Sequence, residues 1–249
     1  MKLKALVFIL LVFNISVVCS QDKNDNKGVS DVVNYVVYKM AEMQQVNVNN
    51  SPKNLQYEEM ISAFDKIECG LYYTKSKSVF KMIDKLELNN DISYQLAAVF
   101  AEGQYYKDII AGTKIKHTEE FGEILNIIMP FEQYKWQIST ETKTISGYKC
   151  YKANCQWEEF DVIRNKKLVF NSTVWFAPEI AAPFGPLGLD GLPGLVLEGS
   201  LNGISYFYAT SVTFDIKKAN INLNKPVQGK FVTEKEYADF TIKSFENFK

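Results

Sequence analysis

Residues 195–216, LVLEGSLNGISYFYATSVTFDI, carry the strongest structural signal of the chain. Asn202 and Gly203 lie between two runs that are rich in β-branched and aromatic residues, which predicts a hairpin with a two-residue turn. In the second run, residues 204–216, apolar and polar side chains alternate, and we expect the even-numbered side chains, the tyrosines among them, to face a core. This hairpin indicates a fold built on antiparallel β-structure.

Further strand patterns lie on the N-terminal side of this hairpin. Between residues 105 and 176, short runs typical of β-strands are separated by glycine-containing or polar turns. Two earlier strands are expected at residues 29–40 and around residues 67–73, where Cys69 lies on the apolar side of the alternation. The aromatic content of 14% agrees with this interpretation, since aromatic side chains favour pleated, half-buried surfaces.

Helices are expected at only a few places. The spacing of apolar residues predicts short helices at residues 55–64 and 90–103, and Thr233 with Glu236 forms a capping box before a final helix. Strands and helices do not alternate as in βαβ units, so a parallel sheet is not expected. The predicted fold is mainly β, of the β-rich α+β class: one large curved antiparallel sheet, or a partly open barrel, with a few peripheral helices.

The segment GPLGLDGLPGL, residues 185–195, precedes the hairpin. Four leucines left together in water would form a large apolar patch, so the segment is expected to pack on its own sheet or on a partner. Pro193 and Gly194 suit the two corners of a type II turn. As a binding loop, the segment would present the following residues: Pro186, Leu189, Gly191, Leu192, Pro193, Gly194 and Leu195.

Three segments in this order carry a family resemblance: ISGYKCYKA (residues 145–153), VWFAPEIAAPFGP (174–186) and GLPGLVLE (191–198). They resemble the GLPGLI family of exported proteins of Gram-negative bacteria, with Val196 where the family motif has isoleucine. The resemblance implies export and a β-rich fold. It supplies no activity, ligand or catalytic residue that could be carried over to this chain.

The first twenty residues have the pattern of a secretory signal peptide. Lys2 and Lys4 precede an apolar run that is too short for a membrane span, and Val18 and Ser20 suit cleavage before Gln21. The predicted organisation is a signal peptide at residues 1–20 and a single GLPGLI-type β-rich domain at residues 21–249. The alternative is a lipoprotein that is lipidated at Cys19. The mature chain contains no further apolar run long enough to span a membrane.

Export affects how the cysteines are interpreted. Cleavage leaves Cys69, Cys150 and Cys155, an odd number in an oxidising compartment. Two pairings are open: Cys150 with Cys155 across a turn, or Cys69 with Cys150 between neighbouring strands. The third alternative is that the thiols are buried and free. No cysteine spacing resembles a zinc site, and His117 is the only histidine, so no metal and no cofactor are predicted.

Catalytic patterns are weak. The chain has no nucleophile elbow, phosphate-binding loop or zinc-protease motif. Four carboxylates could serve as an acid and base pair in a hydrolase of cell-surface polymers, but only if two of them converge in a cleft. These carboxylates are Glu158, Glu159, Asp190 and Glu198.

A formal net charge of -1 gives no indication of nucleic-acid binding. We therefore expect an exported cell-envelope protein, located in the periplasm, at the outer membrane or outside the cell, with a non-enzymatic binding or structural role. Its partner would be an envelope protein, a peptide or a lipid. The alternatives are a carrier that holds an apolar ligand in its curved sheet and, less favoured, the hydrolase.

Overall fold

β-Strands dominate the computed structural model, which describes residues 32–42, 55–88, 90–161, 164, 166–203, 205–216 and 221–247. The predicted signal peptide and Cys19 lie outside these residues. Within these ranges, no helix has the length and apolar character needed to cross a bilayer. The strands are β1 (Asn34–Glu42), β2 (Glu68–Tyr73), β3 (Lys77–Met82), β4 (Gln104–Asp108), β5 (Thr113–Glu120), β6 (Glu123–Ile128), β7 (Gln137–Ile145), β8 (Tyr148–Asp161), β9 (Lys166–Ala177), β10 (Leu195–Ser200), β11 (Ser205–Thr213) and β12 (Lys230–Thr233).

All twelve strands belong to one sheet, in the order β12-β6-β5-β4-β3-β2-β1-β11-β10-β9-β8-β7. Each described pair of neighbours is antiparallel except β12 and β6, which run parallel. β12 and β7 are the two edges, so the sheet is open and does not close into a barrel. The predicted fold class, one large antiparallel sheet with few helices, is confirmed.

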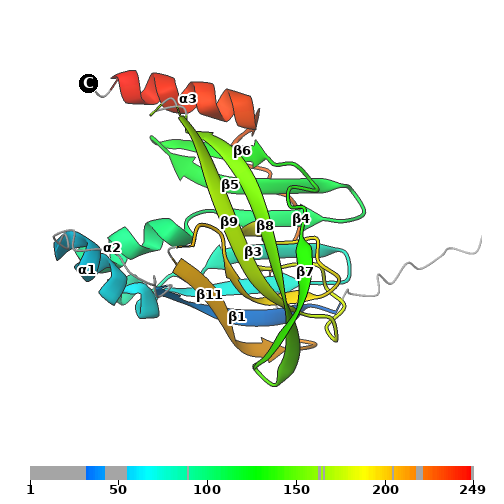
Figure 1. The fold of residues 1–249 in the computed structure, drawn as a ribbon. Coiled ribbons are helices and arrows are strands. Elements are labelled where there is room, and N and C mark those ends of the chain that lie inside the picture. Colours follow the sequence, from blue (N-terminus) through cyan, green and yellow to red (C-terminus); the bar gives the residue numbers. More distant parts are fainter. Residues whose placement is uncertain are drawn as a thin grey trace, which may run out of the picture. The chain divides into compact units, whose positions relative to one another are not determined.

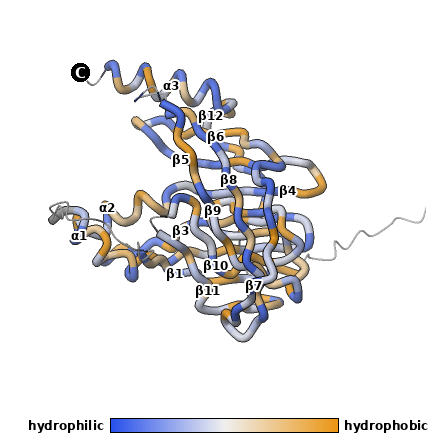
Figure 2. The backbone as a smooth tube through the Cα atoms, in the orientation of Figure 1, coloured by the Kyte–Doolittle hydropathy of each residue, from blue (hydrophilic) through white to orange (hydrophobic). Residues whose placement is uncertain are grey.

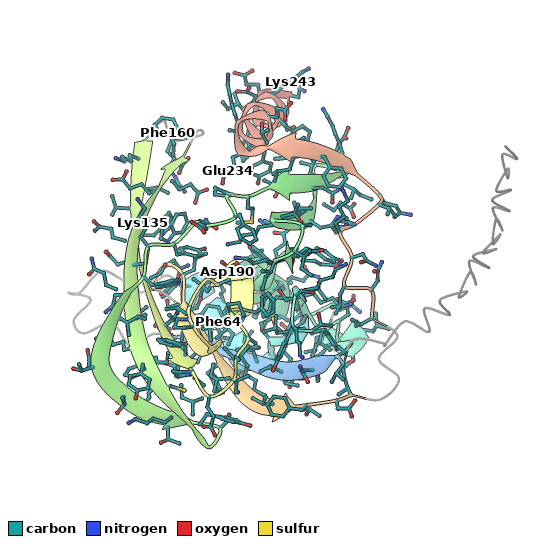
Figure 3. All side chains as sticks on the ribbon, turned by 90° about the vertical axis from the view of Figure 1, so that its right-hand side faces the viewer. Phe64, Lys135, Phe160, Asp190, Glu234 and Lys243 are labelled. Atoms are coloured by element: carbon teal, nitrogen blue, oxygen red, sulfur yellow. The ribbon has the colours of Figure 1, made fainter. Side chains whose placement is uncertain are left out.

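The sheet curls so that its two halves face each other, with β8 and β9 in one half and β4, β5 and β6 in the other. β8 and β9 pass in front of β4, β5 and β6 in Figure 1, and the perpendicular view of Figure 3 separates the two groups of strands, with the segment that contains Asp190 between them. The largest core cluster joins side chains from both halves, including Phe80 of β3, Cys150 of β8 and Phe207 of β11. The hydropathy colouring in Figure 2 shows hydrophobic and hydrophilic residues alternating along many of the strands.

The helices form where the sequence predicts them. They are α1 (Leu55–Ser62), α2 (Ile92–Ala98) and α3 (Glu234–Asn247), with single 3₁₀ turns at Phe64–Lys66, Leu86–Leu88, Val99–Ala101 and Pro186–Gly188. Asp91 caps α2 by accepting a hydrogen bond from the backbone N–H of Tyr94 at 3.2 Å. The capping box of α3 is also present: the N–H of Thr233 donates to Glu236, and the N–H of Glu236 donates to the Thr233 hydroxyl.

The alternation along β11 is confirmed as far as Ala209, but the inner face predicted for this part of the strand is wrong. Phe207 and Ala209 are buried, whereas Tyr206 and Tyr208 are half-exposed on the other face. Phe207 packs edge-on against Phe80, with ring centroids 5.9 Å apart, so the odd-numbered side chains of residues 205–209 belong to the core. Beyond a register shift opposite Val37 and Tyr38, Val212 packs against the core instead, and Ser211 and Thr213 are exposed. Strand alternation specifies two faces, and contacts with other strands decide which one turns inward.

Tyr38 of β1 ties together parts of the sheet that are not direct neighbours. Its side chain is fully buried, and its hydroxyl donates a 2.5 Å hydrogen bond to the backbone carbonyl of Val196 in β10. β11 lies between these two strands in the sheet order. The hydrogen bond therefore stabilises the curvature as well as the pairing.

We expect the substitution Tyr38→Phe to lower the free energy of unfolding by about 1–3 kcal/mol, because it leaves the Val196 carbonyl without this buried donor. Urea denaturation monitored by circular dichroism measures the change. Tyr94→Phe is the matched control, since the buried Tyr94 hydroxyl has no hydrogen-bond partner within the described ranges. Equal losses in the two variants would contradict the assignment.

Candidate functional site

The segment between β9 and β10 runs through the interior of the curled sheet. Leu189 and Leu192 are 0% and 2% exposed, and both pack with Phe176 and Val196. Among the residues predicted to bind a partner, only Gly191 and Pro193 are exposed; Pro186, Leu189, Leu192, Gly194 and Leu195 are buried. The prediction of a partner-binding loop is therefore corrected. The leucines are structural, because their apolar surface is already buried against the chain's own sheet.

Glycines make the sharp corners of this segment, in part as predicted. Gly191 has φ +88°, a conformation that side-chain-bearing residues rarely adopt. The turn around Pro193 differs from the predicted type II turn: the N–H of Gly194 donates to the carbonyl of Leu192 at 2.8 Å, which closes a three-residue turn. This tighter turn brings the backbone of Gly194 directly against that of Ala177, where a Cβ atom would not fit.

Asp190 lies at the centre of the segment, between two lysines of the opposite half of the sheet (Figure 3). Its Oδ1 is 2.7 Å from Nζ of Lys107 in β4, and its Oδ2 is 3.1 Å from Nζ of Lys114 in β5. The indole N–H of Trp136 donates to the Asp190 carbonyl at 2.7 Å. The side chain of Lys114 is 1% exposed. The carboxylate is thus the counter-ion of two buried ammonium groups.

Lys107 and Lys114 also donate hydrogen bonds to neutral oxygen atoms. Lys114 donates to the carbonyl of Gly188 at 2.8 Å and to Oε1 of Gln133 at 3.0 Å, and Lys107 donates to the carbonyl of Phe131 at 3.1 Å. Burial lowers the pKa of Lys114, while Asp190 acts in the opposite direction. A cluster so fully engaged has no group free for catalysis, and we interpret it as a structural clamp.

We expect Asp190→Asn to destabilise the fold by about 3–5 kcal/mol, because it leaves two buried lysines without a counter-ion. Urea denaturation measures the loss, and Glu158→Gln is the control, since Glu158 forms only an exposed pair with Lys167. If Asp190→Asn does not fold, the triple variant Lys107→Met, Asp190→Leu, Lys114→Met should restore folding by removing all three charges. A loss below about 1 kcal/mol in Asp190→Asn would contradict the clamp.

The four candidate catalytic carboxylates occupy separate environments. Asp190 is in the clamp, Glu158 pairs with Lys167 at 2.5 Å, and Glu198 pairs with Lys143 at 2.6 Å. Partial burial raises the pKa of Glu159, with Lys116 opposing the rise and Glu234 adding to it. Among the described residues, no ion pair or hydrogen bond links two of these four carboxylates to one group, so the structure does not supply the converging pair that the hydrolase hypothesis requires.

Metal ligands do not gather in the part of the chain that the structure describes. No group of three His, Cys, Asp or Glu side chains there is placed to hold a metal ion. His117 is half-buried on β5, where its Nδ1 lies 2.7 Å from Oδ1 of Asn126. Its position is that of a hydrogen-bonded strand residue.

Cys69, Cys150 and Cys155 are buried and free, so neither predicted disulfide is present in the structure. Cys150 and Cys155 lie on the single continuous strand β8, five positions apart. At about 3.3 Å per residue this separation is far beyond the reach of a disulfide, and the expected turn between them does not form. Burial raises the pKa of Cys150 to about 11 and raises that of Cys69 further.

Burial should therefore slow modification of all three thiols in the folded protein. At Cys69 and Cys150 the raised pKa also disfavours the thiolate, which is the reactive form. With Ellman's reagent at pH 8, we expect slow reaction of the native mature chain and rapid reaction of three thiols after unfolding in guanidinium. A single reactive thiol in denaturant would instead reveal a disulfide that the structure lacks.

A pocket of about 350 Å³ opens beside the clamped segment, at the 3₁₀ turn that contains Leu187. We call it the Leu187 pocket. Its apolar lining comes from Val99, Phe100, Tyr105, Leu187, Leu201 and Phe207. Ring contacts hold this lining in place: Phe100 packs on Phe64 at 5.3 Å, and both Tyr105 and Phe207 pack on Phe80. The pocket is therefore formed by side chains that the core already fixes.

Polar groups complete the wall of the Leu187 pocket. Lys116 of β5 and Glu102 contribute charges, and Asn202 and Ser205 add neutral polar groups. The structure describes no carboxylate within ion-pair distance of the Lys116 ammonium. Gly103 leaves room for this side chain, since a Cβ atom there would lie 2.8 Å from Cε of Lys116. Lys116 is thus the cation of the pocket that is free to meet a ligand.

Sequence reasoning missed this pocket. Lys116 lies next to His117 in the motif KIKHTEE, and only the histidine was considered there. The sequence does not show that Lys114 and Lys116 of β5 point into the curled sheet, because an alternating strand of this composition would normally turn its lysines to solvent. The carboxylate of Asp190, which neutralises the buried Lys114, lies far along the chain from β5.

Comparisons with known proteins show the fold. No protein-family model matches the chain, and no curated protein matches it. Two solved structures of PNGF-II, in space groups C2 and P21, match with TM-scores of 0.53 and 0.52 at 17% and 18% identity. They cover 86% of this chain, which spans only about a third of theirs (33% and 34%). The fold is shared with part of PNGF-II.

Proposed function

We propose that this chain is an exported, non-enzymatic binding protein of the cell envelope that holds a small amphipathic molecule in the Leu187 pocket. The observation that carries the proposal is the combination of an apolar lining with Lys116, whose ammonium forms no ion pair with any residue that the structure describes. The volume of about 350 Å³ lies within the range of small-molecule sites. The separate environments of the four candidate carboxylates favour binding over hydrolysis.

The apolar lining suits the body of such a ligand. Leu187 and Phe207 belong to the buried core, while Val99 and Phe100 extend the lining toward solvent. A ligand that covers these groups removes apolar surface from water at about 25 cal/mol per Å². Because ring contacts already fix the walls, little conformational entropy is lost on binding.

The polar groups suit one end of the ligand. The Lys116 ammonium can donate hydrogen bonds to a carboxylate or hydroxyl end group. Glu102 lies on the same pocket wall, which limits how much negative charge the site tolerates. A long apolar body with a single small polar or anionic end fits this arrangement.

Export and family membership are part of the proposal and rest on the sequence. The signal-peptide pattern at residues 1–20 supports export, and the three motif segments support membership of the GLPGLI family. The final compartment would be the periplasm, the outer membrane or the medium. The PNGF-II structures supply the fold and no ligand, since the identity is below 20%.

Two fluorescent probes test the binding proposal. N-phenyl-1-naphthylamine reports the apolar body alone, and 11-(dansylamino)undecanoic acid adds a carboxylate end. We expect both to gain fluorescence with the mature chain. Phe100→Ala should weaken both about tenfold, since truncating this ring removes roughly 1–2 kcal/mol of apolar contact. Lys116→Met should weaken only the dansyl acid, about fivefold or more, which corresponds to roughly 1 kcal/mol.

Matched controls lie away from the pocket. Phe160→Ala removes an exposed ring of β8, and Lys166→Met removes an exposed lysine at the start of β9. Both should bind the probes as the wild type does. The proposal fails if neither probe binds, or if Phe100→Ala binds no more weakly than Phe160→Ala.

A further inference from the structure

A second pocket, of about 410 Å³, lies at the beginning of the segment that joins β9 to β10. Residues 179–182 form one wall, and the others come from Asn34 of β1, Tyr73 of β2, Tyr148 of β8 and Phe214 just after β11. We call it the Tyr73 pocket. It shares no lining residue with the Leu187 pocket.

Tyr73 lines this pocket and carries a buried hydroxyl group. The residue is 2% exposed, and among the described residues its hydroxyl has no hydrogen-bond partner. Burial raises the pKa of Tyr73 to about 12, so the hydroxyl keeps its proton at neutral pH and can donate it. A buried hydroxyl left unpaired is costly, which favours a ligand that supplies the missing partner.

The remaining lining residues indicate the chemistry of that ligand. Tyr73, Tyr148 and Phe214 offer aromatic rings, which pack well against the C–H faces of flat, partly apolar molecules. Asn34 accepts a hydrogen bond from the Asp215 N–H through Oδ1, which leaves its amide nitrogen to donate. The carboxylate of Glu179 can accept hydrogen bonds from ligand hydroxyl groups.

The charge of the lining further limits which ligands suit the Tyr73 pocket. Glu179 is the only charged residue of the lining, and it forms no ion pair with any residue that the structure describes. An anionic ligand would meet this carboxylate without a compensating cation. A pure hydrocarbon would leave the Tyr73 hydroxyl, the Asn34 amide and Glu179 without partners.

We propose that the Tyr73 pocket binds a neutral saccharide unit, which stacks on its aromatic rings and exchanges hydrogen bonds with Tyr73, Asn34 and Glu179. A sugar ring combines the two required features, an apolar face and several hydroxyl groups that both donate and accept. The pocket volume lies within the range of small-molecule sites.

The test uses the mature chain with glucose, galactose, mannose and N-acetylglucosamine as probes. Saturation-transfer NMR detects binding, and calorimetric titration measures affinity. We expect at least one of these sugars to bind. Tyr73→Phe removes only the hydroxyl and should weaken binding tenfold or more. Since that hydroxyl is unpaired in the free protein, the same variant should keep the stability of the wild type.

Tyr94→Phe is the matched control. The Tyr94 hydroxyl is also buried and lacks a hydrogen-bond partner in the part of the chain that the structure describes, but Tyr94 does not line the pocket. This variant should therefore bind sugar as the wild type does. Phe214→Ala gives a second variant with little risk to folding, because Phe214 is 50% exposed; it should also weaken sugar binding.

Three outcomes would overturn the proposal. The first is that none of the four sugars binds. The second is that Tyr73→Phe and Phe214→Ala both retain the wild-type affinity. The third is that lysine or choline binds in place of the sugars and is lost in Glu179→Gln, which would assign the pocket to cations. None of these results depends on whether the Leu187 pocket binds its fluorescent probes.

Discussion

The contact of Asp190 with Lys107 and Lys114 is the constraint on which the interior of this protein depends. β4 and β5 turn two lysines toward the inside of the curled sheet, where unpaired ammonium groups would be strongly disfavoured. The segment between β9 and β10 brings the one carboxylate that compensates both. Through these ion pairs the segment links the two halves of the sheet. Its residues Leu189 and Leu192 are buried in the core beside them.

The same segment determines where a ligand can enter. Its first residues, 179–182, form a wall of the Tyr73 pocket, and Leu187 lines the other pocket. Between them, Leu189 and Leu192 fill the space inside the sheet. A curved sheet whose interior is not occupied by side chains could hold one large apolar ligand, as the carrier hypothesis requires. Here the segment fills that space, and the Leu187 and Tyr73 pockets beside it differ in lining and therefore in the ligands that suit them.

Local features could be predicted from the sequence because they depend on neighbouring residues. The capping box of Thr233 formed as expected, and β10 and β11 pair as a hairpin where one was predicted. Its turn is longer than the predicted two residues, because Gly199 pairs with Phe207 and not with Tyr206. The inner face of β11 as far as Ala209 and the turn at Pro193 were predicted wrongly. In both cases a distant contact decides the outcome: Phe80 packs on Phe207 of β11, and Ala177 packs against Gly194.

By itself, the sequence determined the β-rich class, the positions of most strands and helices, and the need to bury the leucines of residues 185–195. Only the tertiary structure decided what buries them, which lysines Asp190 neutralises and which residues line the two pockets. Lys107 and Asp190 are 83 positions apart, and their pairing depends on how the whole sheet curls. Periodicity shows which side chains share a face of a strand, but it does not show which face turns inward or which distant side chain is met there.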